Sequence, residues 1–396
     1  MKPLPTCALL AAALAATPVF AQSKAPPTGL TLDLRLRSES VDDAAFARDA
    51  DATTLRVRAG WRLPLGTHWR GLVELEHTSH LGAEQFNSSA NGRIGLPTIA
   101  DADNTELNQA WLAWVPSDAT QVAAGRQRLV FDNQRFIGNA GWRQNEQTFD
   151  ALDVQHKTAS GWRLRYGYLD GVQRVFAGDH AADANAHWDL AGHLANVGHA
   201  LGPGVLTGYA YWIENRTLPL SSHRDLGLRY ALRHDAKDAL GWFANAEFAR
   251  QSPYADGRDI NEADYALLEG GLLWHGSTFK LGRELLGGDG RYGFATPLAS
   301  LHAFNGWADR FTSTPAEGLD DRYLGWNRNF GKLEAVVAWH DYRSDAHARD
   351  FGSEWDASLG WRANPHWLLL AKAADYRAGD VGADVRKAWL SVEYSH

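Results

Sequence analysis

Through almost its whole length the chain places an apolar side chain at every second position. In the segment 30–37 leucines alternate with polar residues, and the segments 54–63, 162–168 and 354–362 repeat the pattern. A period of two puts the two kinds of side chain on opposite faces of a β-strand. Soluble β-sandwiches alternate as well, so the pattern predicts strands without deciding which all-β class they form.

The number of strands and the lengths of the connections narrow the choice. About eighteen strand candidates follow one another, each of roughly the ten residues that a tilted outer-membrane strand needs. Brief turns such as 64–66, 202–204 and 275–276 alternate with longer polar loops such as 78–104 and 287–318. Short turns on one side and long loops on the other are typical of outer-membrane barrels. We therefore predict an all-β fold, a closed antiparallel transmembrane β-barrel of about 18 strands.

The first residues have the pattern of a secretory signal. Lys2 precedes an apolar stretch that Thr17-Pro18 ends, and Val19-Phe20-Ala21 offers small residues for cleavage before Gln22. The stretch is too short to span a membrane. We expect a signal peptide at 1–21, a short periplasmic lead-in at 22–29 and the barrel at 30–396, located in the outer membrane of a Gram-negative cell.

Tryptophans cluster within a few residues of the predicted short turns. Such amphipathic rings favour the boundary between hydrocarbon and water, although they also occur in soluble cores. We interpret them as a girdle that contacts the lipid bilayer and its lipopolysaccharide. The residues are Trp61, Trp69, Trp114, Trp162, Trp242, Trp274, Trp326, Trp361 and Trp367.

Many arginines fall at polar positions of the predicted strands. Facing lipid near the midplane, each would cost ~2–4 kcal/mol, so we expect them in the lumen. A guanidinium there can bind a carboxylate of the wall or of a passing solute. A wall-stiffening ladder of ion pairs and a path for anions both remain open. The predicted pore-lining residues are Arg35, Arg37, Arg56, Arg58, Arg126, Arg128, Arg163, Arg165, Arg229, Arg283, Arg322 and Glu247.

Two segments carry a more specific signal than the strand pattern. One runs from Gly125-Arg126-Gln127-Arg128 to Gly138 and on through Gly141-Trp142-Arg143 to Asp150; the other runs from 282 to 311. Together with the strand 244–251 they resemble the alginate export family of outer-membrane porins. The resemblance implies an eighteen-stranded barrel that passes an anionic or small hydrophilic solute, without implying alginate itself.

The long loops are the candidates for narrowing such a pore. Because the predicted periplasmic turns are short, any lid must come from outside loops such as 78–104 or 287–318. Loop 287–318 either folds inward and narrows the pore or only caps the wall. The constriction-loop candidates are Arg135, Arg143, His302, Asn305, Trp307 and Asp309.

Other functions find less support in the sequence. The net charge of -8 argues against a nucleic-acid partner, and neither a zinc-binding H-E-x-x-H motif nor a nucleotide-binding βαβ unit is present. We expect no metal, no cofactor and a monomeric barrel. The favoured function is passive diffusion of anionic solutes such as sugar acids or oligosaccharides. The alternatives are export of an anionic polysaccharide such as alginate with a periplasmic assembly, and a barrel enzyme that pairs Ser391 or Ser358 with His340 or His396.

Overall fold

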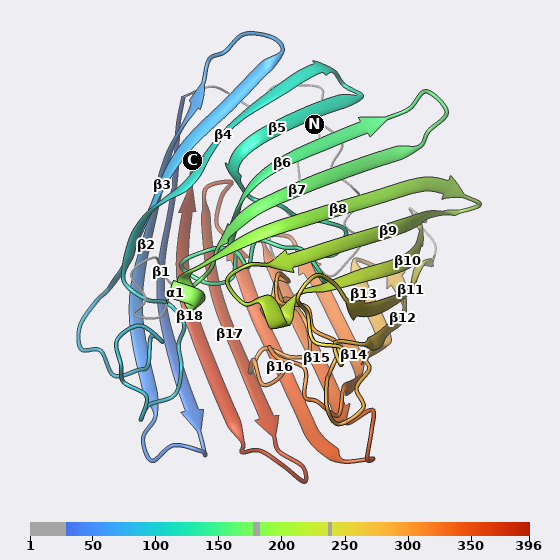
Figure 1. The fold of residues 1–396 in the computed structure, drawn as a ribbon. Helices are drawn as coiled ribbons and strands as arrows, with labels where there is room; N and C mark the ends of the chain where they lie inside the picture. Colours follow the sequence, from blue (N-terminus) through green and yellow to red (C-terminus); the bar gives the residue numbers. More distant parts are fainter. Residues whose placement is uncertain (1–28, 177–182, 237–239) are drawn as a thin grey trace.

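The computed structural model describes residues 29–176, 183–236 and 240–396. The expected signal peptide, 1–21, and all but the last residue of the lead-in lie outside these residues. Eighteen strands form one antiparallel sheet in which each strand pairs with the next along the chain (Figure 1). The strands are β1 (Gly29–Asp43), β2 (Ala50–Leu63), β3 (Trp69–His80), β4 (Asn104–Ser117), β5 (Thr120–Gln127), β6 (Thr148–Lys157), β7 (Arg163–Gln173), β8 (His187–Leu201), β9 (Gly204–Asn215), β10 (His223–His234), β11 (Gly241–Pro253), β12 (Ala263–Trp274), β13 (Ser277–Leu286), β14 (Leu319–Phe330), β15 (Leu333–Arg343), β16 (Asp350–Arg362), β17 (Trp367–Arg377) and β18 (Val385–Ser395), with the short helices α1 (Asp183–Ala186), η1 (Pro219–Ser221) and η2 (Leu301–Ala303) in connections.

The sheet closes on itself through its first and last strands. β1 pairs with β18 in a register that runs from Asp33 opposite Ser395 to Asp43 opposite Val385. Closure gives every strand two neighbours, so no row of backbone N–H and C=O groups is left unpaired toward lipid. The predicted closed barrel is confirmed. No helix in the described ranges is long and apolar enough to cross a membrane.

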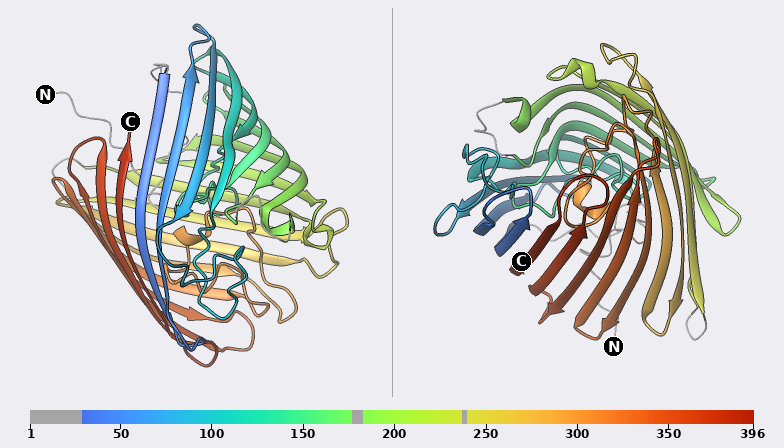
Figure 2. Two further views of the ribbon diagram at one scale, coloured as in Figure 1. Left: turned by 90° about the vertical axis from the view of Figure 1, so that its left-hand side faces the viewer. Right: turned by 90° about the horizontal axis from the view of Figure 1, so that it is seen from below.

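The connections divide between the two ends of the barrel as predicted. Turns such as 118–119, 202–203 and 275–276 lie at one end, which we call the turn end. The long connections 81–103, 128–147 and 287–318 start from the other end, the loop end, which is the cell exterior in barrels of this type. Loops 128–147 and 287–318 do not stay outside but enter the ring of strands (Figure 2).

The outward face of the wall is apolar and aromatic. Leu268, Leu281 and Leu390 point outward with 64–68% of their surface exposed. The tryptophans that the sequence assigned to a girdle are exposed on the same face, except for the half-buried Trp326. The exposed rings are Trp61, Trp69, Trp114, Trp162, Trp242, Trp274, Trp361 and Trp367.

One part of the lumen is filled by an aromatic core. Phe136 of loop 128–147 packs against Tyr211 of β9, Tyr265 of β12 and Phe294 of loop 287–318, with ring centroids 5.5–6.0 Å apart. All four rings are buried. Edge-on contacts of this kind add to the free energy gained by burying the rings. The core therefore holds both loops against the wall and leaves the open space of the lumen beside them.

Candidate functional site: a charged passage in the lumen

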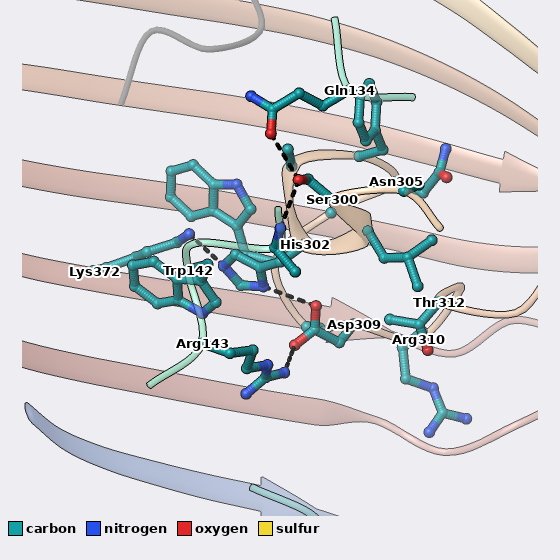
Figure 3. Close-up of a pocket in the computed structure, with 18 of the residues that line it drawn as sticks. Gln134, Trp142, Arg143, Ser300, His302, Asn305, Asp309, Arg310, Thr312 and Lys372 are labelled. Atoms are coloured by element: carbon teal, nitrogen blue, oxygen red, sulfur yellow. Dashed lines mark hydrogen bonds and ion pairs between the residues drawn. The ribbon is translucent and has the colours of Figure 1, made fainter. Parts of the chain in front are cut away.

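A cavity of about 920 Å³ lies between the two inner loops and the wall. Asp43, Pro97 and Arg174 line it near the loop end, whereas Glu334 and Glu393 line it in the half toward the turn end. The cavity therefore follows the barrel axis past the inner loops. Figure 3 shows the residues where loop 287–318 meets loop 128–147 and the wall.

Arginines of β1 and β2 hold loop 128–147 inside the barrel. Arg35 donates to the backbone oxygens of three consecutive residues, the nearest being Trp142 at 3.0 Å, and Arg37 donates to the same oxygen at 2.6 Å. Arg58 donates to the backbone oxygen of Gln144 at 3.3 Å. These side chains point inward as the sequence predicted. Arg37 and Arg58 are buried under the loop and do not line the cavity, so their contacts serve to anchor the loop.

A buried carboxylate completes this anchor. Glu146 of the loop lies 2.5 Å from a guanidinium nitrogen of Arg128 and 3.6 Å from one of Arg58, and the amide of Asn108 donates to it at 2.7 Å. Burial alone would raise the pKa of Glu146, but the guanidinium groups of Arg128 and Arg58 outweigh it and hold the pKa well below its usual range. The glutamate is therefore charged in the folded barrel. Glu76 of β3 pairs with Arg58 on the other side.

Loop 287–318 also folds inward, the first of the two arrangements that the sequence left open. The amide of Asn305 donates to Glu284 at 2.7 Å and to Asp321 at 3.0 Å, both on the inner wall. Arg135 of the other loop bonds Glu284 at 2.8 Å and the amide oxygen of Asn305 at 3.0 Å. All four side chains are buried. Arg135 thus joins the two inner loops to each other and to the wall.

The remaining constriction candidates meet in one cluster with a wall lysine (Figure 3). Asp309 lies 2.6 Å from the guanidinium of Arg143 and 2.7 Å from Nδ1 of His302. It also lies 3.1 Å from Nζ of Lys387 on β18. The indole of Trp142 stacks on the imidazole of His302 with centroids 4.5 Å apart. One carboxylate therefore orders two cations and a histidine at the place where the loops meet.

Lys372 of β17 is the basic side chain in this cluster that has no carboxylate partner. Its Nζ lies 2.6 Å from Nε2 of His302 and sits over the rings of Trp142 at 4.0 Å and Trp307 at 3.7 Å. No carboxylate among residues 29–176, 183–236 and 240–396 forms an ion pair with it. Burial lowers the pKa of His302 well below 6.5, so its Nε2 is unprotonated and accepts from the ammonium group.

Charge is separated across the cavity. Lys372, Lys387, Arg35 and Arg143 lie on the side of β17, β18, β1 and loop 128–147. The opposite side, formed by β12 to β15, carries acids, of which Glu269 pairs with Lys280 at 3.4 Å. The acids on that side are Glu269, Glu284, Asp321 and Glu334. The first side also carries Asp309 and Glu393, the latter 3.1 Å from Arg35, so a solute in the cavity lies between a wall on which basic groups outnumber acids and an acidic wall.

Other predicted lumen residues form ion pairs on the inward face. Arg165 binds Asp153 at 2.8 Å, and Arg229, which lines the cavity, binds Glu247 at 2.8 Å. Arg56 of β2 pairs with Asp33 of β1. Arg163 shares the inward face of β7 with Arg165 but lies at the turn end. Both interpretations of the arginines thus find support, because the ion pairs brace the wall and two of the paired arginines, Arg35 with Glu393 and Arg229 with Glu247, also line the cavity.

Three arginines differ from the prediction and face outward. Arg283 lies two positions after the lipid-facing Leu281 in β13, so its side chain points to the same, outer face. Arg283 and Arg322 both bind Asp320, at 2.7 and 2.8 Å. Arg126 binds Asp150 with two bonds of 2.8–2.9 Å on the outer face. All three lie close to the loop end of their strands, where an outward arginine costs only ~0–1 kcal/mol. The midplane penalty used in the prediction does not apply there.

Sequence reasoning missed several residues of the passage. Lys372 is the only charged residue at the inward positions of β17, and the alternation of that strand could have identified it. Trp142 and Arg174 lie outside strands, where no period indicates their direction. Arg174 stacks on Trp188 at 4.0 Å near the loop end of the cavity, and burial lowers its pKa to about 10.

Comparisons with known proteins agree with this architecture. A family model described as alginate export matches residues 27–231. No match was found among curated proteins. The crystal structure of outer membrane protein OpdK from Pseudomonas aeruginosa is 16% identical, with a TM-score of 0.70 over 93% of this chain and 98% of that chain. OccAB2 from Acinetobacter baumannii is 14% identical, with a TM-score of 0.72 over the same shares.

A further structure shows OpdK with vanillate. It is 15% identical to this chain, with a TM-score of 0.69 over 93% of this chain and 98% of that one. At these identities the likeness establishes a shared fold. The comparisons point to a transport family and to outer-membrane proteins rather than to enzymes.

Proposed function

The chain belongs to the alginate export family of outer-membrane channels, and from this premise we propose that it conducts small hydrophilic anions such as sugar acids. The observation that carries the proposal is the group of basic side chains on one side of the cavity, among them Lys372, which forms no ion pair with a carboxylate of the described residues. Arg35, Arg143 and Lys387 lie on the same side of the cavity. Passive flow down a concentration gradient needs no further chemistry from the protein.

The arrangement of charge suggests how an anion would move. Arg174 and Arg310 lie on the cavity near the loop end and would attract an anion before it reaches Lys372. At an effective dielectric constant near 20, a unit anion about 5 Å from an ammonium group gains roughly 3 kcal/mol. That gain offsets part of the hydration lost in the narrow segment. Because several cations share the task, no single site needs to bind so tightly that the solute is trapped.

The similar structure of OpdK with vanillate supports the size and charge class of the solute. Vanillate is a small molecule with one carboxylate. A molecule of that size fits a cavity of about 920 Å³, which lies within the usual range for small-molecule sites.

Ion selectivity tests the proposal. Reversal potentials in planar bilayers under a potassium chloride gradient should indicate an anion preference, and Lys372→Gln should reduce that preference severalfold. Lys332→Gln is the matched control, because Lys332 lies in a turn and donates to the backbone oxygen of Ala363. Heat-dependent migration in gels shows whether each variant is folded. Equal reversal potentials for Lys372→Gln and wild type would contradict the proposal.

Export of an anionic polysaccharide is the second candidate, and the family match favours it. Both inner loops enter from the loop end, so a polymer would have to displace loops 128–147 and 287–318 or thread between them. Uronate oligomers of graded length, added on the turn side, distinguish the two functions. Small-solute diffusion predicts that permeation falls off within a few sugar units, whereas an exporter would pass long chains.

A further inference from the structure

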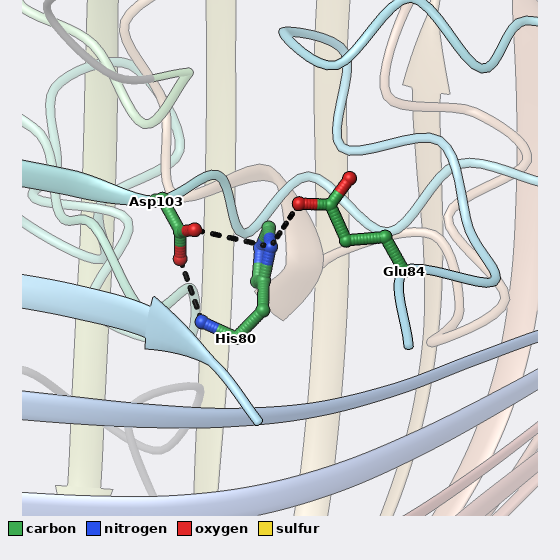
Figure 4. Close-up of side chains that lie close together, drawn as sticks. All are labelled: His80, Glu84 and Asp103. Atoms are coloured by element: carbon green, nitrogen blue, oxygen red, sulfur yellow. Dashed lines mark hydrogen bonds and ion pairs between the residues drawn. The ribbon is translucent and has the colours of Figure 1, made fainter. Parts of the chain in front are cut away.

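Three side chains with metal-binding atoms meet at the loop end, outside the cavity. His80 is the last residue of β3, Glu84 lies early in loop 81–103 and Asp103 is the last residue of that loop (Figure 4). Nδ1 of His80 lies 3.4 Å from a carboxylate oxygen of Glu84 and 3.5 Å from one of Asp103. The three candidate ligand atoms all lie within 4.8 Å of one another.

The hydrogen bond made by Nε2 of His80 determines which nitrogen of the ring carries the proton in the neutral imidazole. Nε2 of His80 lies 2.7 Å from the backbone oxygen of Asp101, which can only accept. Nε2 therefore carries a proton, and in the neutral ring Nδ1 is an acceptor that lies between the oxygens of Glu84 and Asp103, which approach it from opposite sides (Figure 4). Three electron-rich atoms facing one another need a cation, either a proton or a metal ion, between them.

The distances favour a metal ion over a proton. A protonated imidazole bonded to carboxylates would bring nitrogen and oxygen to about 2.7–2.9 Å. Tetrahedral Zn²⁺ with ligand bonds of about 2.0–2.1 Å instead sets neighbouring ligand atoms about 3.3 Å apart. The two separations from Nδ1, 3.4 and 3.5 Å, are close to that value, and the oxygens of Glu84 and Asp103, which lie within 4.8 Å of each other, would move together on binding the ion.

Each side chain is also held from behind, as ligands of a metal site are. The other oxygen of Asp103 accepts the backbone N–H of His80 at 2.6 Å. The other oxygen of Glu84 bonds the amide of Asn91 at 3.4 Å and lies 3.6 Å from the guanidinium of Arg93. Together with the bond from His80 to Asp101, these contacts hold all three side chains in place around Nδ1.

We propose that His80, Glu84 and Asp103 bind a Zn²⁺ ion, with water as the fourth ligand. The half-exposed carboxylate of Asp103 leaves the site open to solvent. Ca²⁺ is disfavoured because it takes oxygen ligands and not imidazole. This site could not be predicted from the sequence, because Asp103 lies 23 positions after His80 and no zinc motif contains the three residues.

The ion would fix the outer loop beside the inner one. The carboxylate of Asp101 accepts the backbone N–H of Gln144 at 2.8 Å and lies 3.6 Å from Arg37. Pro97 and Thr98 of the same outer loop line the cavity. Binding at His80 therefore orders the entrance of the passage from the loop end.

Zinc binding to the barrel without a histidine tag tests the proposal. Titration calorimetry in detergent should show one equivalent of Zn²⁺, and Co²⁺ substitution should give the visible absorption of a tetrahedral ion. His80→Gln and Asp103→Asn should each weaken binding at least tenfold. His77→Gln is the matched control, because this exposed histidine bonds Thr105 nearby and is no part of the cluster.

Several outcomes would overturn the site. Wild type that binds no stoichiometric Zn²⁺, or His80→Gln that binds it as well as wild type, contradicts the proposal. Equal competition by millimolar Ca²⁺ also contradicts it. Should His80→Gln fail to fold, Glu84→Gln and Asp103→Asn give the same test with the imidazole in place.

Discussion

Removing the carboxylate of Glu146 should release loop 128–147 from the wall without unfolding the barrel. Glu146→Ala leaves Arg58 and Arg128 without the ion that both face, at 3.6 and 2.5 Å. It also removes the acceptor for the amides of Asn108 and Asn139. The wall strands keep their backbone pairing, so the damage should be confined to the loop.

The expected size of the effect follows from burial. Glu146 and Arg58 are both almost fully buried, and removing one partner of an isolated buried pair costs about 3–5 kcal/mol. Because Arg58 keeps Glu76 and Arg128 keeps Glu74 at 3.0 Å, we expect the lower end of that range, about 3 kcal/mol. Each 1.4 kcal/mol is a factor of ten in an equilibrium constant. If the whole cost opposes closure of the loop against the wall, the fraction of molecules with the loop open should rise by roughly two orders of magnitude.

Hydrogen exchange measured by mass spectrometry reports the open fraction. The backbone N–H groups of Gln144 and Gln147 donate within the folded loop, to Asp101 and to the oxygen of Asn139, each at 2.8 Å. Peptides that contain them should lose protection in Glu146→Ala, while peptides of β11 and β16 should not. Single channels should also flicker more, because the loop lines the passage.

The matched control is Glu262→Ala, which removes a partner of Arg250 from an exposed ion pair. Exposed pairs contribute about 0–1 kcal/mol, so exchange in loop 128–147 should stay unchanged. Unaltered protection of loop 128–147 in Glu146→Ala would refute the view that this carboxylate anchors the loop.

Acid gives the same anchor a second test. Because the pKa of Glu146 is lower in the folded barrel than its ordinary 4.5, its contribution is fully present above 4.5 and is lost only as the pH falls through the depressed folded value. Loop protection, corrected for intrinsic exchange rates, should therefore persist from pH 7 down to pH 5. Loss of protection already near pH 5.5 would contradict the assignment.

Three further predictions concern the lumen and the outer face. Gly306→Ala should loosen loop 287–318 by about 1–3 kcal/mol, because the glycine has φ of +83° and a Cβ would lie 2.2 Å from the hydroxyl of Tyr342; greater exchange in that loop would show it. Arg283→Gln should change the melting temperature little and leave ion selectivity unaltered, since this arginine binds Asp320 on the outer face, and a changed reversal potential would count against that position. The imidazole of His302 should stay neutral between pH 7.5 and 5.5, because burial lowers its pKa. NMR signals of the His302 ring that shift with pH in that interval would contradict this prediction.

Alternation was enough to predict the barrel and much of its inward face. Leu30 to Arg37 in β1 and the Trp-rich strand ends gave the correct faces because lipid and water impose opposite demands on successive residues. The rule failed for Arg126 and Arg283. Near the rim an outward arginine costs little, so polarity no longer indicates the direction of the side chain.

The inner loops could be named from the sequence but not placed. Nothing in the spacing of residues 128–147 indicates that the backbone oxygen of Trp142 meets Arg35 and Arg37, because these contacts join positions more than a hundred residues apart. Lys372 gains its role only when loop 287–318 brings His302 and Trp307 to it. The shape and lining of the passage depend on how irregular segments pack against distant strands. The alternation of polar and apolar residues carries no information about that packing.

The sign of the wild-type reversal potential tests the central claim most directly. With potassium glucuronate on one side of a planar bilayer and a tenfold lower concentration on the other, a lumen governed by Lys372 and its neighbouring cations should pass the sugar acid more readily than potassium. The potential should then have the sign set by the anion. A potential with the sign set by potassium would contradict the account.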